Sequence, residues 1–142
     1  MKAQIVLKKI NDLISLVMTD GVQPSDLADN IFVDSYVKVG YTKINGEVTG
    51  ELVFEEEGSI RTITTLRYFY DVHRKIIRIE EEVHNAKKVI WDRSHQEAQM
   101  INEIVDMMEE LYSTEQIKTF IASLPENIQT KLVATSTRKR AS

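Results

Sequence analysis

The fold of this chain is decided by residues 36–54, which read YVKVGYTKINGEVTGELVF. Asn45-Gly46 at the centre of this stretch is typical of a two-residue type I′ turn, because both residues tolerate the positive φ that such a turn requires. The turn places Val39 opposite Leu52, so that one face of the hairpin is apolar along both strands. The stretch therefore predicts two antiparallel strands with one buried face.

Strand-like alternation continues outward from this hairpin and extends from Ile31 to Trp91. A three-residue loop is expected at Glu56-Glu57-Gly58, with Phe54 opposite Ile60. Further turns are expected around His73-Arg74 and at Asn85-Ala86-Lys87. These turns predict a five-stranded antiparallel meander. Its apolar face comprises Val39, Leu52, Phe54, Tyr68 and Ile79.

Helical periodicity flanks the predicted sheet on both sides. Apolar residues recur every three or four positions from Lys2 to Thr19, and they predict one amphipathic helix that ends before Gly21. After Trp91 the same period predicts three helical pieces. Ser113 and Gln116 form a capping-box pattern at the start of the second piece.

This order of elements predicts the α+β class. We expect an N-terminal helix, the five-stranded meander, and C-terminal helices packed on one sheet face in two layers. One domain is expected over residues 1–134. Small, polar and basic residues predict a flexible basic tail over residues 135–142.

Composition limits the function classes. The chain has 142 residues, a formal net charge of −4 and no cysteine, which excludes disulfides, thiolate nucleophiles and cysteine-ligated metals. No apolar run approaches the roughly 20 residues that cross a bilayer. We therefore expect a soluble cytoplasmic protein with no membrane partner.

No catalytic, cofactor-binding or metal-binding motif stands out. The chain lacks nucleophile motifs and phosphate-binding glycine patterns. His73, His84 and His95 fall at the ends of different predicted elements, so that a shared metal site would require distant residues such as His84 and His95 to converge. We expect no enzyme activity, no cofactor and no metal.

The helix after Trp91 is the candidate surface for protein binding. The helix after Trp91 is apolar over more than half its circumference, and a second copy of the chain would cover the surplus in a homodimer. The run Glu55-Glu56-Glu57 is typical of a solvated hairpin end, and it is also where a basic partner would be attracted. By elimination of the other classes, the sequence favours a non-catalytic interaction, accessory or regulatory module that binds protein through the sheet and the helix after Trp91. The possible interface on the helix comprises Met100, Met107, Met108 and Tyr112.

The alternative is a small nucleic-acid-binding regulator. Aromatic residues on the outer sheet face, among them Tyr36, would stack bases while cations hold phosphates. Acidic residues such as Glu80 and Glu82 on the same face oppose this role. The possible contacts are Lys38, Arg61, Arg67, Phe69, Arg78, Arg138, Lys139 and Arg140.

Overall fold

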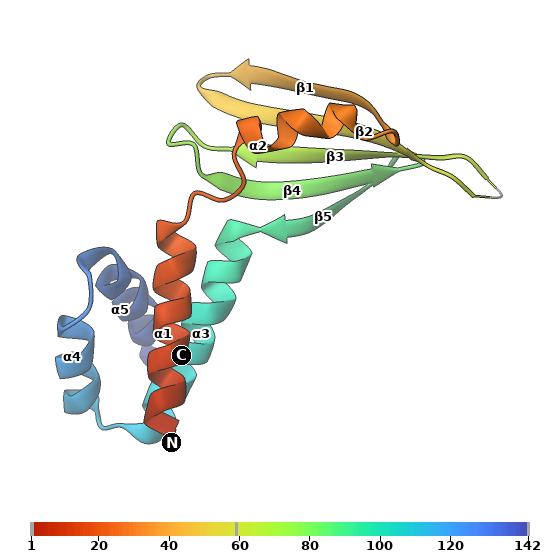
Figure 1. Ribbon diagram of the computed structural model, residues 1–142. Coiled ribbons are helices and arrows are strands. Elements are labelled where there is room, and N and C mark those ends of the chain that lie inside the picture. Colours follow the sequence, from red (N-terminus) through yellow and green to blue (C-terminus); the bar gives the residue numbers. More distant parts are fainter. Residues whose placement is uncertain (1, 59, 142) are drawn as a thin grey trace. The chain divides into compact units, whose positions relative to one another are not determined.

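The computed structural model describes residues 2–58 and 60–141, with side chains from 3 to 135 except 59, and it confirms the α+β class (Figure 1). An N-terminal helix precedes a five-stranded antiparallel sheet, and helices follow it. The elements are α1 (Lys2–Met18), α2 (Pro24–Ala28), the 3₁₀-helix η1 (Asp29–Phe32), β1 (Tyr36–Ile44), β2 (Glu47–Glu56), β3 (Thr62–Tyr70), β4 (Ile76–Val83), β5 (Ala86–Asp92), α3 (Arg93–Leu111), α4 (Thr114–Ala122) and α5 (Glu126–Ala141).

The chain forms two compact units. A helical unit contains the residues up to Met18 and those from His95 onward, and a sheet unit contains Thr19–Ser94. None of the helices in the described part of the chain combines the length and apolarity needed to cross a membrane.

The helical unit has a core of its own, made by the apolar stripes of α1, α3, α4 and α5. The predicted capping box at the start of α4 is confirmed: the Gln116 amide donates to the Ser113 hydroxyl, and Gln116 accepts from the Ser113 amide. The backbone of α5 is helical through Ala141, so this helix includes most of the residues 135–142 that were predicted as a flexible basic tail. The most deeply buried residues of this core are Val6, Ile10, Leu13, Ile104, Val105, Met108, Ile128 and Leu132.

The sheet unit has the predicted meander order, β1-β2-β3-β4-β5, with every pair antiparallel. Asn45 and Gly46 form the first turn with φ of 53° and 82°, as a type I′ turn requires. Val39 lies opposite Leu52, as predicted. Tyr68 lies opposite Ile79, also as predicted.

The second and fourth turns differ from the prediction. The connection between Glu56 and Thr62 is longer than three residues, so Phe54 lies opposite Thr64 and not Ile60. This slip is an even number of residues, and it therefore leaves every side chain on its predicted face. The last turn is His84-Asn85, where both residues have positive φ, and not Asn85-Ala86-Lys87.

One face of the sheet is covered by α2 (Figure 1). Leu27 of α2 is buried, and the Tyr41 hydroxyl of β1 donates to the carbonyl oxygen of Pro24. The guanidinium group of Arg93 is buried and donates to the carbonyl oxygens of Ile76 and Thr19. These bonds attach the segment before α2 to the sheet.

Candidate functional site: an acidic, aromatic-lined pocket

The structure places the methionine-rich stripe of α3 in the core of the helical unit. Met108 is only 1% exposed, and Met100, Met107 and Tyr112 are partly buried against the same core. Helices α1, α4 and α5 contribute the rest of this core, so the width of the stripe is explained within one chain. The stripe therefore gives no reason to expect a second copy on α3.

The proposed nucleic-acid contacts within the sheet lie together on one face. Phe69 of β3 lies opposite Arg78 of β4. Arg67 of β3 lies opposite Glu51 of β2, and Glu51 also contacts Lys38 of β1. Arg61 lies just before β3. The side chains of Arg138, Lys139 and Arg140 are outside the described residues.

Carboxylates neutralise the cations at the centre of this face. Arg67 lies between Glu51 and Glu82, with nitrogen–oxygen distances of 3.2 and 3.1 Å. Lys38 lies 3.0 Å from the other oxygen of Glu51. The hydrogen bond from Lys38, assisted by Arg67, lowers the pKa of the Glu51 carboxyl below its ordinary value. Lys38 and Arg67 are therefore held in a network of ion pairs within the chain.

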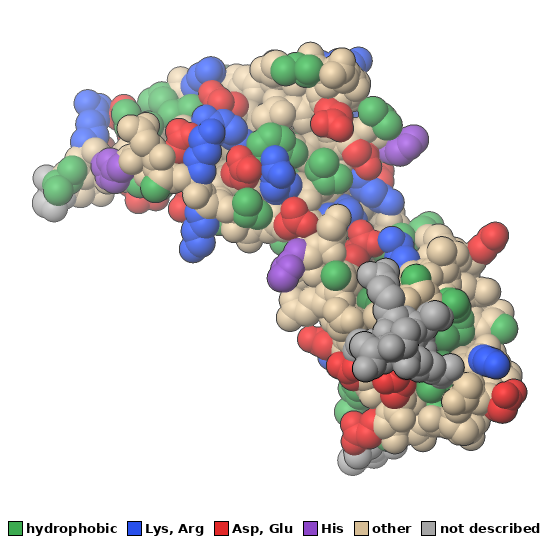
Figure 2. All heavy atoms as spheres, turned by 180° about the vertical axis from the view of Figure 1, so that it is seen from behind, with side chains coloured by type: hydrophobic (Ala, Val, Ile, Leu, Met, Phe, Trp, Pro, Cys, Tyr) green, Lys and Arg blue, Asp and Glu red, His purple; other side chains and the backbone are tan. Residues whose placement is uncertain are grey.

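The two remaining cations among the predicted nucleic-acid contacts with described side chains are also paired. Arg61 lies 2.8 Å from Glu55, and Arg78 lies 3.2 Å from Glu80 while covering the ring of Phe69 at 4.4 Å. Figure 2 shows this mixture of basic and acidic side chains over the sheet. Such a balanced face offers phosphates little unpaired positive charge.

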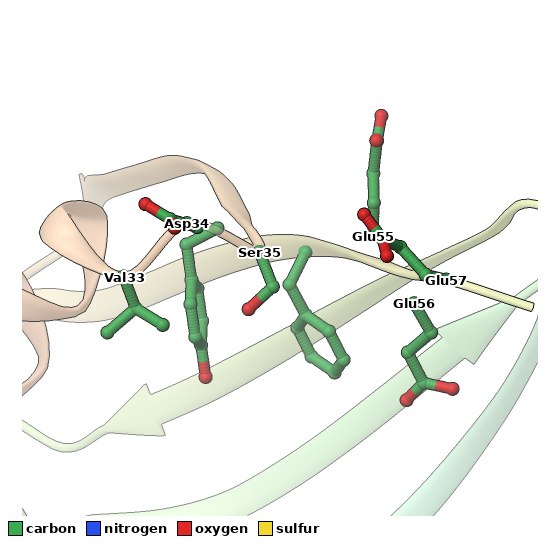
Figure 3. Close-up of a pocket in the computed structure, with 8 residues that line it drawn as sticks. Val33, Asp34, Ser35, Glu55, Glu56 and Glu57 are labelled. Atoms are coloured by element: carbon green, nitrogen blue, oxygen red, sulfur yellow. The ribbon is translucent and has the colours of Figure 1, made fainter.

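A pocket of about 850 Å³ opens where β1 begins and β2 ends (Figure 3). The charged side chains that line this pocket are all acidic, whereas the face that contains Arg67 carries both acidic and basic side chains. The walls of the pocket are Val33, Asp34, Ser35, Tyr36, Phe54, Glu55, Glu56 and Glu57.

Backbone hydrogen bonds fix the segment that forms one wall of this pocket. The Tyr36 amide donates to the Val33 carbonyl oxygen at 2.9 Å, which closes the turn after η1. The Glu55 amide donates to the Ser35 carbonyl oxygen at 2.8 Å, which attaches that turn to β2. The pocket is therefore formed by ordered backbone on both sides.

A β-bulge at Val37 brings the aromatic residues of the pocket together. The register shifts there, so Tyr36 lies opposite Phe54 and not on the charged face with Lys38. The two ring centroids are 5.3 Å apart, with the ring planes tilted by 45°. The prediction that Tyr36 belongs to a base-stacking face is therefore wrong.

Four acidic side chains line this pocket, and Glu56 lies on the same side of β2 as the rings (Figure 3). Glu56 is two residues beyond Phe54 on β2 and projects to the same side of the strand, whereas Glu55 projects to the other side (Figure 3). Only Glu55 forms an ion pair, with Arg61, among the pocket carboxylates and the described cations. The pocket therefore combines an aromatic surface with unneutralised carboxylates.

Exposed apolar residues lead into the pocket from η1. Phe32 is 84% exposed, and its neighbours Ile31 and Val33 are exposed as well. Val37, the bulged residue on the far side of the turn, is also exposed. Scattered single apolar residues on a surface are ordinary, but a consecutive run beside a pocket is typical of an interaction site.

Sequence reasoning found the acidic part of this pocket and missed the rest. The run of three glutamates at 55–57 is visible in the sequence, whereas the aromatic pair depends on a bulge that no residue pattern predicts. The exposure of residues 31–33 was also missed, because an apolar run looks like the start of a buried strand.

Neither residue clusters nor relatives assign a chemistry to the chain. Among the described residues, no group of three or more histidine, aspartate or glutamate side chains could hold a metal ion. Comparisons with protein-family models, curated proteins and solved structures found no match. The function is therefore argued from the geometry of the pocket.

Proposed function

We propose that this chain is a non-catalytic protein-interaction module of the cytoplasm, and that its pocket binds a partner segment in which lysine or arginine alternates with apolar residues. The observation that carries the proposal is that one pocket is lined both by the adjacent rings of Tyr36 and Phe54 and by the carboxylates of Asp34, Glu56 and Glu57.

The chemistry of the pocket fits a long cationic side chain. Aromatic faces attract ammonium and guanidinium groups, and one such contact contributes about 0.5–1 kcal/mol of binding free energy at an exposed site. The methylene stem of lysine or arginine packs on the rings while its charged end reaches a carboxylate such as Glu56. A partner with alternating apolar residues would also cover the exposed side chains at 31–33.

The charge balance supports a basic partner over nucleic acid. The pocket concentrates unpaired negative charge in a chain whose formal net charge is −4. The cations of the opposite sheet face, Arg67 among them, are held by carboxylates. Phosphate would be repelled at the pocket and poorly held elsewhere.

Calorimetric titration with two designed hexapeptides tests this function. The basic probe is acetyl-Lys-Leu-Lys-Val-Lys-Leu-amide, and the acidic probe carries glutamate in place of each lysine. We expect the basic peptide alone to bind, with an affinity that falls as salt rises because Coulomb attraction is screened. The double variant Glu56→Lys/Glu57→Lys should abolish binding.

The matched control is Glu109→Lys/Glu115→Lys, which changes the charge equally at two exposed glutamates outside the pocket. This control should bind the basic peptide nearly as well as the unchanged chain. An equal loss of peptide binding in both double variants would show that binding depends only on the net charge of the chain, and it would contradict a specific site. Salt-sensitive binding of a single-stranded DNA oligomer, with no peptide binding, would favour the nucleic-acid alternative.

A further inference from the structure

The two edges of the sheet are not equivalent. Strands β1 and β5 each have one strand neighbour, so the outward amides and carbonyls of both are available for pairing. The register of β5 is interrupted beside Val89, where Ile90 is an extra residue. In β1 the only interruption is at Val37, and residues 38–44 pair with β2 in a continuous register.

The regular part of β1 carries exposed side chains on both faces. Ile44 is 68% exposed, and Tyr41, Thr42 and Lys43 are exposed as well. Helix α2 lies against one face of the sheet, where Pro24 accepts the hydrogen bond of the Tyr41 hydroxyl (Figure 1). The edge of β1 is therefore open for a further strand.

Lysines on an edge strand normally prevent self-pairing by placing like charges opposite each other. In an antiparallel pair related by a two-fold axis perpendicular to the sheet, opposed residues lie on the same face. Lys38 and Lys43 are five residues apart in a regular strand and so point to opposite faces. The two lysines therefore never oppose each other across such an axis.

We propose that two copies of the chain join through β1, antiparallel and centred on Tyr41, into one continuous sheet. This register places Lys38 opposite Ile44 of the partner subunit, whose β2 neighbour is Glu47. The Lys38 ammonium group, 3.0 Å from Glu51 in its own chain, then has a second carboxylate across the interface. Charge complementarity between Lys38 and Glu47 of the partner subunit favours this partner.

Cysteine cross-linking tests the register, because the chain has no cysteine of its own. In Tyr41→Cys the two new thiols would face each other across the axis, where opposed Cβ atoms are about 4.5–5.5 Å apart and near disulfide reach. Mild oxidation should convert most of this variant into a covalent dimer. Ile90→Cys, on the opposite edge, is the matched control and should remain uncross-linked.

Light scattering provides a readout that does not depend on oxidation. The unchanged chain and Tyr41→Phe should have twice the mass of one 16.4 kDa chain at micromolar concentration. Tyr41→Lys, which places two ammonium groups opposite each other, should reduce the mass to that of one chain. A monomer in the unchanged protein, or cross-linking through Ile90→Cys instead, would overturn the proposal.

Discussion

The phenolic hydroxyl of Tyr70 donates a 2.6 Å hydrogen bond to the backbone carbonyl oxygen of Val22. Tyr70 ends β3, whereas Val22 belongs to the segment that leads into α2. The bond therefore attaches the chain before α2 to the sheet. Since Tyr70 is only 2% exposed, burial raises the pKa of its hydroxyl to about 12.

Tyr70→Phe should lower the free energy of unfolding by about 1–2 kcal/mol, because the Val22 carbonyl oxygen loses its buried donor. Urea unfolding at neutral pH measures this loss. Tyr36→Phe is the control, since Tyr36 is a partly exposed tyrosine of the same unit and is not part of the bond to Val22. Equal effects of the two variants would contradict the role of this bond.

The same residue predicts a stability change at alkaline pH. The folded-state pKa of Tyr70 is raised from 10.0 to about 12, so its contribution is complete below pH 10 and is lost as the pH rises toward 12. The unchanged chain should lose stability more steeply over this interval than Tyr70→Phe. Parallel curves for the two proteins would show that Tyr70 ionises normally in the folded state.

Arg93→Met should lower the free energy of unfolding by about 3 kcal/mol, since one buried and one partly buried carbonyl oxygen lose a charged donor. Its guanidinium nitrogens lie 2.7 Å from the Ile76 oxygen and 2.9 Å from the Thr19 oxygen. Arg61→Met removes an exposed ion pair with Glu55 and should cost less than about 1 kcal/mol. An Arg93 variant as stable as the Arg61 variant would refute the anchoring role.

Gly21→Ala should destabilise the chain by more than about 2 kcal/mol, for two independent reasons. Gly21 has φ of +90°, and an added Cβ would collide with Cγ2 of Ile76. Gly40→Ala is the control because its Cβ would meet only the Lys38 Cε atom, at 3.8 Å. Thermal unfolding compares the two, and similar melting temperatures would contradict the close packing at Gly21.

As the pH falls, the free energy of unfolding of Glu51→Gln should decrease less than that of the unchanged chain. The pKa of Glu51 in the folded chain is lowered from 4.5 by Lys38 and then by Arg67, so its contribution is complete above pH 4.5 and is lost as pH falls through the lowered value. The ion pairs are partly exposed, so their total contribution to the free energy of unfolding at neutral pH should be about 1 kcal/mol or less. Glu109→Gln, at an exposed glutamate outside this network, should leave the loss of stability in acid unchanged, and an identical response from both variants would contradict the network.

The faces of the sheet were predictable from the sequence because strand alternation tolerates errors of an even number of residues. The predicted pairing of Phe54 with Ile60 was wrong, yet Leu52, Tyr68 and Ile79 lie on one face as expected. The Asn45-Gly46 turn was also predictable, since few residue pairs adopt two positive φ angles.

The candidate site was less predictable because it depends on local departures from regular pairing. One extra residue at Val37 moves Tyr36 to the face of Phe54, and nothing in the side-chain pattern distinguishes this bulge from regular pairing. The stripe around Met108 was interpreted as a surface because the sequence does not reveal which helices share a core. Only the glutamates at 55–57 indicated a basic partner in advance.

The most direct test of the pocket is a nuclear magnetic resonance titration of the ¹⁵N-labelled chain with the basic hexapeptide. We predict chemical-shift changes concentrated at residues 31–36 and 54–57, with the amides around Arg67 unaffected. The acidic hexapeptide should leave the same spectrum unchanged. Shifts centred on the charged sheet face, or an equal response to both peptides, would contradict a cation-binding pocket at Tyr36 and Phe54.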